Sequence, residues 1–360
     1  MLGKRVSTID TPALLVDLAA LERNIAHMAT FFKQANVNWR PHTKGVKVPA
    51  IAFKEIQAGA IGITCAKLGE AEAMAKAGVQ TILIANQIVG PEKIRRLVNL
   101  RKRTDILVCI DSIENAEALN RAAEMEKLAL RVLIEVNLGM NRCGTEPGIS
   151  TVAVAKQVLS LGSLKFSGLM GWEGHLASKP ASTEKRLACE TAVGALVKTA
   201  EACREAGLAV DIVSCGGTGT YQYTAHVPGI TEIQAGGGVL CDLAYRNWGV
   251  SHELALSVLA TIISRPNSLR VVADAGRKAM QREVVVPEPK SIAANGPVRL
   301  SAEHAAFDLA EPRSDLKVGD KIEFFVGYGD TTVCLHDEMF GVRDGIVEAV
   351  WPILARSRFR

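Results

Sequence analysis

The residues of this chain that are best suited to covalent chemistry lie in the stretch RPHTKGVKVPAIA, residues 40–52. Arg40, His42 and Lys44 follow directly on a short apolar run with strand character. A lysine amine that is neutral near pH 7 can form a Schiff base with a carbonyl compound. Most lysines are instead solvated surface cations, and we expect Lys47, in the following helix, to be one of them. Whether Lys44 differs depends on what the fold places near it.

Eight apolar runs of strand character alternate with amphipathic helical segments between about residues 13 and 255. The expected strands are residues 37–40, 60–65, 81–86, 105–111, 131–138, 165–172, 211–217 and 231–237. Near-continuous apolar strands separated by helices are typical of a parallel sheet, and eight such units favour a closed α/β barrel of the (β/α)8 TIM type. A doubly wound open sheet is the alternative, although no GxGxxG motif follows the first strand.

The chain changes character after about residue 255. Segments such as SLRVVADAG and DKIEFFVGYGD read as strands joined by Gly, Pro and Asn turns, with little helical periodicity. We therefore expect two domains. The barrel is expected over residues 13–255, and a mostly β C-terminal domain over residues 256–360 together with residues 1–12.

Two glycine-rich loops, SCGGTGT (214–220) and QAGGG (234–238), follow the last two expected strands. Their backbone N–H groups, with the hydroxyls of Thr218 and Thr220, are suited to binding a phosphate, and barrels often place a phosphate site after strands seven and eight. Tight turns alone would also explain these glycines. A reactive Lys44 across the barrel mouth from two phosphate loops indicates pyridoxal 5'-phosphate (PLP) as the cofactor.

The composition is that of a globular protein for which we expect neither nucleic-acid nor membrane binding. The net charge is +4 on 360 residues, and the lysines and arginines are scattered. No apolar run reaches about 18 residues, and the N-terminus lacks the pattern of a signal peptide. The eight cysteines form no CxxC pair, which fits reduced core residues of a cytoplasmic protein.

Several motifs, in the same order along the chain, resemble the D-threonine aldolase / D-serine dehydratase family of fold-type III PLP enzymes. These motifs are IDTPALLVDLAALERNI, RPHTKGVKVPAIA, GITCAKLGEAEAM, NRCG, GGTGT, EIQAGG, DAGRK and LHDEMFGVRDGIVEAVWPILAR. The resemblance covers nearly the whole chain. It implies an alanine-racemase-like barrel with a C-terminal β domain, a homodimer, and an amino acid as the small-molecule substrate.

The resemblance also implies roles for individual residues. Lys44 is similar to the family's Schiff-base lysine, and His42 and Arg40 are similar to its neighbours. Arg142, in NRCG, matches the arginine beside the cofactor, where it would face the pyridine nitrogen. The residues that match the phosphate-binding loops are Thr218, Gly219, Thr220, Gly236 and Gly237.

Two places depart from the family's pattern. Where the family has a metal-binding His-x-Asp or His-x-Cys pair, this chain has Tyr328 and Asp330, so only Asp330 matches a metal ligand and divalent-metal binding is left open. Where the aldolases read YHGS, this chain reads WEGH, which offers Glu173 and His175 in place of a histidine base. We therefore expect Glu173, His175 or Tyr328 to transfer protons.

Three functions are compatible with these residues. The first is a PLP-dependent lyase that uses Lys44 on a D-β-hydroxy-amino acid, either by retro-aldol cleavage, as in D-threonine or 3-hydroxy-D-aspartate aldolases, or by dehydration, as in D-serine dehydratase. The second is a metal-independent amino-acid racemase or epimerase with Lys44 and Tyr328 on opposite faces of the substrate. The third is a non-catalytic PLP carrier, which the β domain disfavours because such carriers are single-domain barrels.

Overall fold

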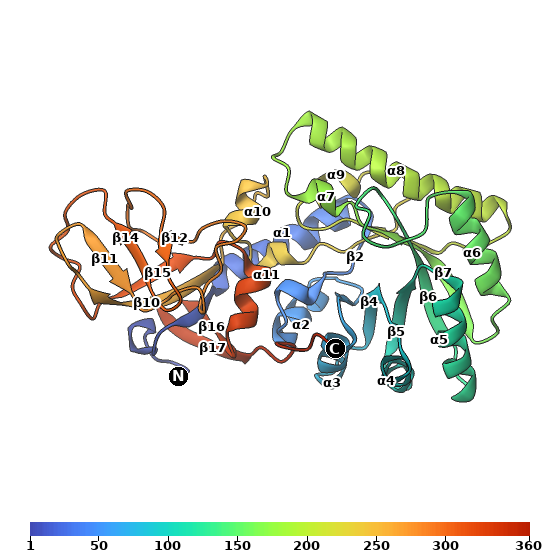
Figure 1. The fold of residues 1–360 in the computed structure, drawn as a ribbon, viewed down its shortest axis with the longest axis horizontal. Coiled ribbons are helices and arrows are strands. Elements are labelled where there is room, and N and C mark those ends of the chain that lie inside the picture. Colours follow the sequence, from blue (N-terminus) through green and yellow to red (C-terminus); the bar gives the residue numbers. More distant parts are fainter. The chain divides into compact units, whose positions relative to one another are not determined.

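A computed structural model describes all residues from 1 to 360, and the chain divides into two units (Figure 1). The barrel unit comprises residues 27–44, 49–236 and 357–360, and the β unit comprises residues 1–26, 45–48 and 237–356. These units are defined by contacts within the chain. The predicted domain limits, 13–255 against 1–12 with 256–360, stay a prediction.

The barrel unit contains eight parallel strands, one for each strand expected from the sequence. They are β2 (Asn38–Trp39), β3 (Ile63–Cys65), β4 (Thr81–Gln87), β5 (Asp105–Ile110), β6 (Leu130–Val136), β7 (Leu164–Gly171), β8 (Ile212–Cys215) and β9 (Glu232–Ile233). Their order in the sheet is β2-β9-β8-β7-β6-β5-β4-β3. A parallel bridge between His42, just after β2, and Thr64 of β3 joins the two ends of this order. The predicted parallel α/β barrel is therefore confirmed.

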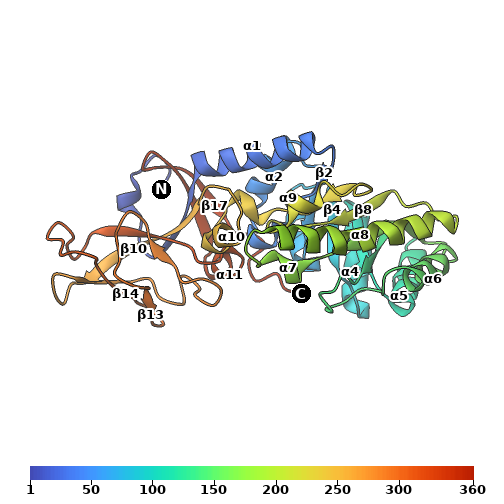
Figure 2. The same cartoon turned by 90° about the horizontal axis from the view of Figure 1, so that it is seen from above.

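Helices connect these strands and cover the outside of the sheet (Figure 1). They are α2 (Pro49–Gln57), α3 (Leu68–Lys76), α4 (Pro91–Arg101), α5 (Ile113–Met125), α6 (Ile149–Leu159), α7 (Gly174–Ala177), α8 (Thr183–Glu205) and α9 (Tyr221–Thr224). Helix α1 (Leu18–Gln34) precedes β2, and its residues 18–26 belong to the β unit. Local sequence sets several of their starts, because Ser112 and Ser182 cap α5 and α8 with their hydroxyls and Pro91 is the first residue of α4. The longest helix, α8, which Figure 2 shows along its length, packs on α6 and β7.

The β unit is built on a nine-stranded, mostly antiparallel sheet. Its strands are β1 (Ala13–Asp17), β10 (Leu256–Ser264), β11 (Arg270–Ala273), β12 (Glu288–Pro289), β13 (Arg299–Leu300), β14 (Ala305–Asp308), β15 (Lys321–Phe325), β16 (Glu338–Arg343) and β17 (Ile346–Pro352). The order is β13-β14-β11-β10-β1-β16-β17, with β15 pairing both β10 and β12, and only β1 and β16 run parallel. Two short helices, α10 (Leu243–Asn247) and α11 (Gly329–Thr332), complete the unit.

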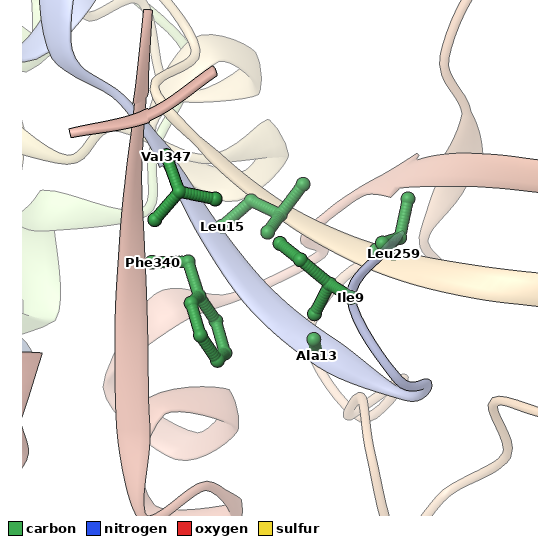
Figure 3. Packing of buried hydrophobic residues seen from close by; sticks show 6 residues of the cluster. All are labelled: Ile9, Ala13, Leu15, Leu259, Phe340 and Val347. Atoms are coloured by element: carbon green, nitrogen blue, oxygen red, sulfur yellow. The ribbon is translucent and has the colours of Figure 1, made fainter. Parts of the chain in front are cut away.

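The core of the β unit joins residues from both ends of the chain. Leu15 of β1 packs with Leu259 of β10, Phe340 of β16 and Val347 of β17, and Ile9 and Ala13 complete the cluster (Figure 3). All six side chains are almost completely buried. The apolar N-terminal segment therefore belongs to the same core as the C-terminal strands.

Lys47 differs from the sequence-based expectation. It is only 5% exposed, its φ is +57°, and it precedes α2, so it is not a solvated cation of that helix. Its carbonyl accepts the Ala355 N–H at 3.2 Å. The prediction was wrong because residues 45–48 belong to the β unit and are packed there.

None of the helices has both the length and the apolar character needed to cross a bilayer.

Candidate functional site

Lys44 lies at the C-terminal end of β2, in the short 3-10 turn Thr43–Gly45. The turn is held on both sides. The buried Thr43 hydroxyl donates to Glu70 Oε1 at 2.8 Å, and the Lys44 N–H donates to His42 Nδ1 at 3.3 Å. His42 in turn donates its N–H to the Gln234 carbonyl at 3.0 Å. The half-buried Lys44 side chain therefore starts from a fixed backbone at the barrel rim, where barrel enzymes place their catalytic residues.

Arg40 forms a buried ion pair with Glu232 inside the barrel unit. Its Nε lies 3.1 Å from both carboxylate oxygens of Glu232, and both side chains are at most 5% exposed. One guanidinium nitrogen, Nη1, has no hydrogen-bond partner in the chain. Arg40 was predicted to lie near the reactive lysine, whereas its partner Glu232 was not predicted, although a lone acidic residue in the strand-like run TEIQAGG is a signal for a buried ion pair.

The glycine-rich loops lie after β8 and β9, at the same edge of the sheet as Lys44. A side chain at Gly236 would overlap the backbone of His42, so only glycine permits this close approach to the lysine turn. Gly219 and Gly236 are buried, yet their N–H groups donate to no acceptor of the chain. Buried N–H groups are nearly always paired in folded proteins. Two such donors after adjacent strands fit the phosphate that the sequence predicts, so these residues fit PLP.

Glu173 supports the loop after β8. It is fully buried; its Oε1 accepts the Thr220 hydroxyl at 2.5 Å and its Oε2 accepts the Gly216 N–H at 3.4 Å. Burial raises the pKa of the Glu173 carboxyl, and the hydrogen bonds from Thr220 and Gly216 oppose that shift. The Thr220 hydroxyl, expected to bind phosphate, is thus already engaged with Glu173.

Arg142 is half exposed and lies 3.4 Å from Oε1 of Glu135, a buried residue of β6. The same carboxylate accepts a hydrogen bond from Gln87 Nε2 at 2.6 Å and from the Cys143 thiol at 3.1 Å. Sequence reasoning named Arg142 but overlooked Glu135, although an acidic residue inside the apolar run RVLIEVNL was visible. Glu135 therefore orients the segment that carries Arg142.

His175, in α7, is exposed, and its ring would be the first contact of any side chain added at Gly139. Gly139 belongs to the loop after β6 that also carries Arg142. The structure thus brings His175 next to that loop, whereas Glu173, two residues earlier, points into the protein interior.

In the β unit, Tyr328 and Asp330 flank the start of α11. The Tyr328 hydroxyl forms hydrogen bonds with the side chains of Tyr245 and Asp330, and it donates to Asp330 because a carboxylate oxygen accepts. Burial and the nearby carboxylates raise the pKa of Tyr328, so its phenol is neutral at physiological pH. Asp242, buried and with a pKa raised to about 7 mainly by desolvation, accepts the Gly329 N–H at 2.6 Å and so fixes this segment.

These donors do not fit a divalent metal. A neutral phenol that donates its proton to Asp330 offers a metal one carboxylate and one weak ligand, whereas such sites want several charged or imidazole ligands. A side chain at Gly45 would overlap Asp330 Oδ1, so that oxygen packs against backbone. The chain has no group of three or more His, Cys, Asp or Glu residues arranged to hold a metal ion.

Two protein-family models match most of the chain. Residues 16–241 match the alanine racemase N-terminal domain, and residues 255–342 match the serine dehydratase domain. The chain is 33% identical to D-threonine aldolase from Arthrobacter sp., over 99% of this chain and 95% of that protein. It is 31% identical to 3-hydroxy-D-aspartate aldolase from Paracoccus denitrificans, over 99% and 94% of the two chains. D-threo-3-hydroxyaspartate dehydratase from Delftia sp. is 34% identical over 77% of this chain and 74% of that protein.

Solved structures agree with these similarities. The crystal structure of D-threonine aldolase from Filomicrobium marinum matches with a TM-score of 0.95 at 34% identity, over 99% of this chain and 98% of that one. The Delftia dehydratase matches with a TM-score of 0.87 at 28% identity, over 97% and 98%. Alanine racemase from Clostridium difficile, at 14% identity over 96% of this chain and 100% of that one and with a TM-score of 0.75, shares the fold alone.

Proposed function

Because this chain belongs to the family of D-threonine and 3-hydroxy-D-aspartate aldolases, whose members are PLP-dependent lyases, we propose that it is a PLP-dependent lyase of D-β-hydroxy-amino acids. The proposed reaction is retro-aldol cleavage between the α- and β-carbons, which releases glycine and an aldehyde. The D-threonine aldolase structure matches this chain more closely than the dehydratase structure does, with a TM-score of 0.95 against 0.87, which supports cleavage ahead of dehydration.

The observation that carries the proposal is the packing of the lysine turn against the glycine loop after β9. Gly236 approaches the backbone of His42, and the N–H groups of Gly236 and Gly219 are left for a ligand. Lys44 would hold the aldehyde end of PLP, and the two glycine N–H groups would bind its phosphate. Arg142, oriented by Glu135, is assigned to the cofactor ring. When bound, PLP supplies a sink for the electrons of the bond that breaks.

The proton of the substrate's β-hydroxyl needs an acceptor, and we assign this role to Tyr328 and Asp330. A neutral phenol is a poor base by itself, but it can pass its own proton to Asp330 while it takes up the proton from the substrate. The oxygen atom of Tyr328 then carries the same number of protons before and after the step. His175 is the remaining candidate for exchange of a proton at the α-carbon.

A racemase or epimerase is the second candidate, and Tyr328 is the observation that favours it, because a phenol can also exchange a proton at the α-carbon. The lyase and the racemase differ in their products, because a racemase inverts the α-carbon without releasing an aldehyde.

A homodimer is part of both proposals, and sedimentation at several protein concentrations tests it.

The test combines a spectrum with product analysis. Protein supplied with PLP is expected to show a visible absorption band that disappears in Lys44→Ala. D-threonine, D-phenylserine and 3-hydroxy-D-aspartate are then offered, and glycine and aldehyde are measured. Ammonia with a 2-oxo acid would identify a dehydratase, and inversion without cleavage a racemase. A band without any turnover would indicate a carrier, and a colourless protein would refute the proposal.

A further inference from the structure

The segment between β7 and α8 fits the loop after β8 at three points. The ring of Trp172 would overlap any side chain at Gly217. The carbonyl of Ala177 lies 2.6 Å from the position that a side-chain Cβ of Gly219 would occupy. Glu173, between these two contacts, hydrogen-bonds to the same loop. Residues 172–177 therefore form a surface that defines the backbone path of residues 216–220.

Glu173 makes the polar part of this surface. The Gly217 N–H donates to Thr220 Oγ1 at 3.1 Å, and the Thr220 hydroxyl donates to Glu173 Oε1 at 2.5 Å. The second carboxyl oxygen accepts the Gly216 N–H at 3.4 Å. One carboxyl thus fixes both ends of the glycine loop. Gly219, in the middle of the loop, keeps its N–H free of any acceptor in the chain.

A general base must come within hydrogen-bond distance of the proton that it removes. Glu173 is 0% exposed, and each of its oxygens already accepts a hydrogen bond from the loop. A carboxyl in such a place is costly to bury, so its contribution has to come from what it orders. These contacts argue against the direct proton-transfer role that the sequence suggested.

We propose that Glu173 is a positioning residue that holds residues 216–220 in the conformation that presents the Gly219 N–H to the cofactor phosphate. This inference rests on the proposed function, since it assigns the phosphate of PLP to this loop. It makes Thr220 part of the same support, with its hydroxyl directed at Glu173 and not at the ligand.

Four variants test the inference: Glu173→Ala, Glu173→Gln, Thr220→Val and Thr220→Ser. Each is stripped of PLP and titrated with it, and the phosphorus NMR shift of bound PLP reports the phosphate environment. Glu173→Ala removes the carboxyl that accepts from both Thr220 and Gly216 and is expected to raise the dissociation constant of PLP about 10- to 100-fold. Thr220→Val is expected to act in the same direction, and Thr220→Ser, which keeps the hydroxyl, to restore wild-type affinity.

Comparing the dissociation constant of PLP with kcat distinguishes a positioning role of Glu173 from a catalytic one. With PLP saturating, Glu173→Gln is expected to keep kcat within about threefold of wild type, because its carbonyl still accepts from Thr220. Glu190→Gln on the exposed face of α8 is the matched control and is expected to change neither quantity. If Glu173→Ala does not fold, as judged by circular dichroism, the PLP affinities and phosphorus shifts of Glu173→Gln and the two Thr220 variants test the inference in its place.

Two results would overturn the inference. One is unchanged PLP affinity and phosphorus shift in Glu173→Ala and Thr220→Val. The other is a Glu173→Gln variant with normal PLP affinity and a kcat reduced more than about 100-fold, the signature of a lost base. A wild type that binds no PLP would instead refute the proposed function, and this inference with it.

Discussion

Replacing Glu55 should stabilise the protein. This residue of α2 is 1% exposed, and neither of its carboxyl oxygens has a hydrogen-bond partner in the chain. Burial raises the pKa of the Glu55 carboxyl well above its ordinary value, with no opposing interaction. The folded chain therefore binds a proton on Glu55 more tightly than the unfolded chain does, so this carboxyl costs stability as the pH rises above its unfolded pKa.

The size of the effect follows from the two unpaired carboxyl oxygens. A buried polar group without a hydrogen-bond partner costs about 1–3 kcal/mol. An apolar side chain of similar volume removes that cost. For Glu55→Leu we therefore expect a gain of about 1–3 kcal/mol in the free energy of unfolding at pH 7.

The pH dependence gives the sharper assay. A carboxyl whose pKa is raised by folding costs nothing below its unfolded pKa, and its cost grows as the pH rises through the interval up to its folded pKa. Urea unfolding of wild type, Glu55→Leu and Glu55→Gln at pH 5 and pH 7.5 should show a larger difference at the higher pH. The exposed residue Glu201 provides the control, and Glu201→Gln should shift unfolding by no more than about 0.5 kcal/mol. A Glu55→Leu gain that is absent, or equal at both pH values, would refute the reasoning.

Three further predictions concern the site. Tyr328→Phe should lower kcat, measured by aldehyde release, about 10²- to 10⁴-fold while the visible PLP band remains. Unchanged turnover would exclude proton transfer through Tyr328. Dialysis against EDTA should leave activity within about twofold of the untreated enzyme; full loss that Mn²⁺ restores would show that Asp330 binds a metal despite Tyr328. Arg40→Met leaves Glu232 buried without its partner and should cost about 3–5 kcal/mol in urea unfolding, most of which Arg40→Met with Glu232→Leu should recover.

The strands and the glycine loops were predictable because local patterns specify them. Eight apolar runs gave eight parallel strands, and GGTGT and QAGGG fall after β8 and β9 as expected. The environment of a charged side chain is a different matter. Lys47 was expected in solvent and is 5% exposed, since its position depends on packing in the β unit. Glu232 was overlooked because its partner Arg40 follows another strand, and Glu135 because it binds both Gln87 of β4 and the loop after its own strand.

Glu173 shows the same limit at the candidate site. Its place in WEGH marks it as a residue that follows a barrel strand, and that much is readable from the sequence. Whether its carboxyl turns to the mouth of the barrel or into the loop after β8 depends on contacts with residues more than forty positions away. The spacing of residues along the sequence does not specify those long-range contacts.

The phosphate loops contain no lysine or arginine, since residues 214–220 and 234–238 read SCGGTGT and QAGGG. Backbone amides neither gain nor lose a proton in the range where enzymes work. The groups that bind the phosphate at Gly219 and Gly236 would thus keep the same protonation throughout that range, and only the second ionisation of the phosphate itself, at pH ~6, would change the interaction. The acid and alkaline limits of catalysis would then arise from groups outside these two loops.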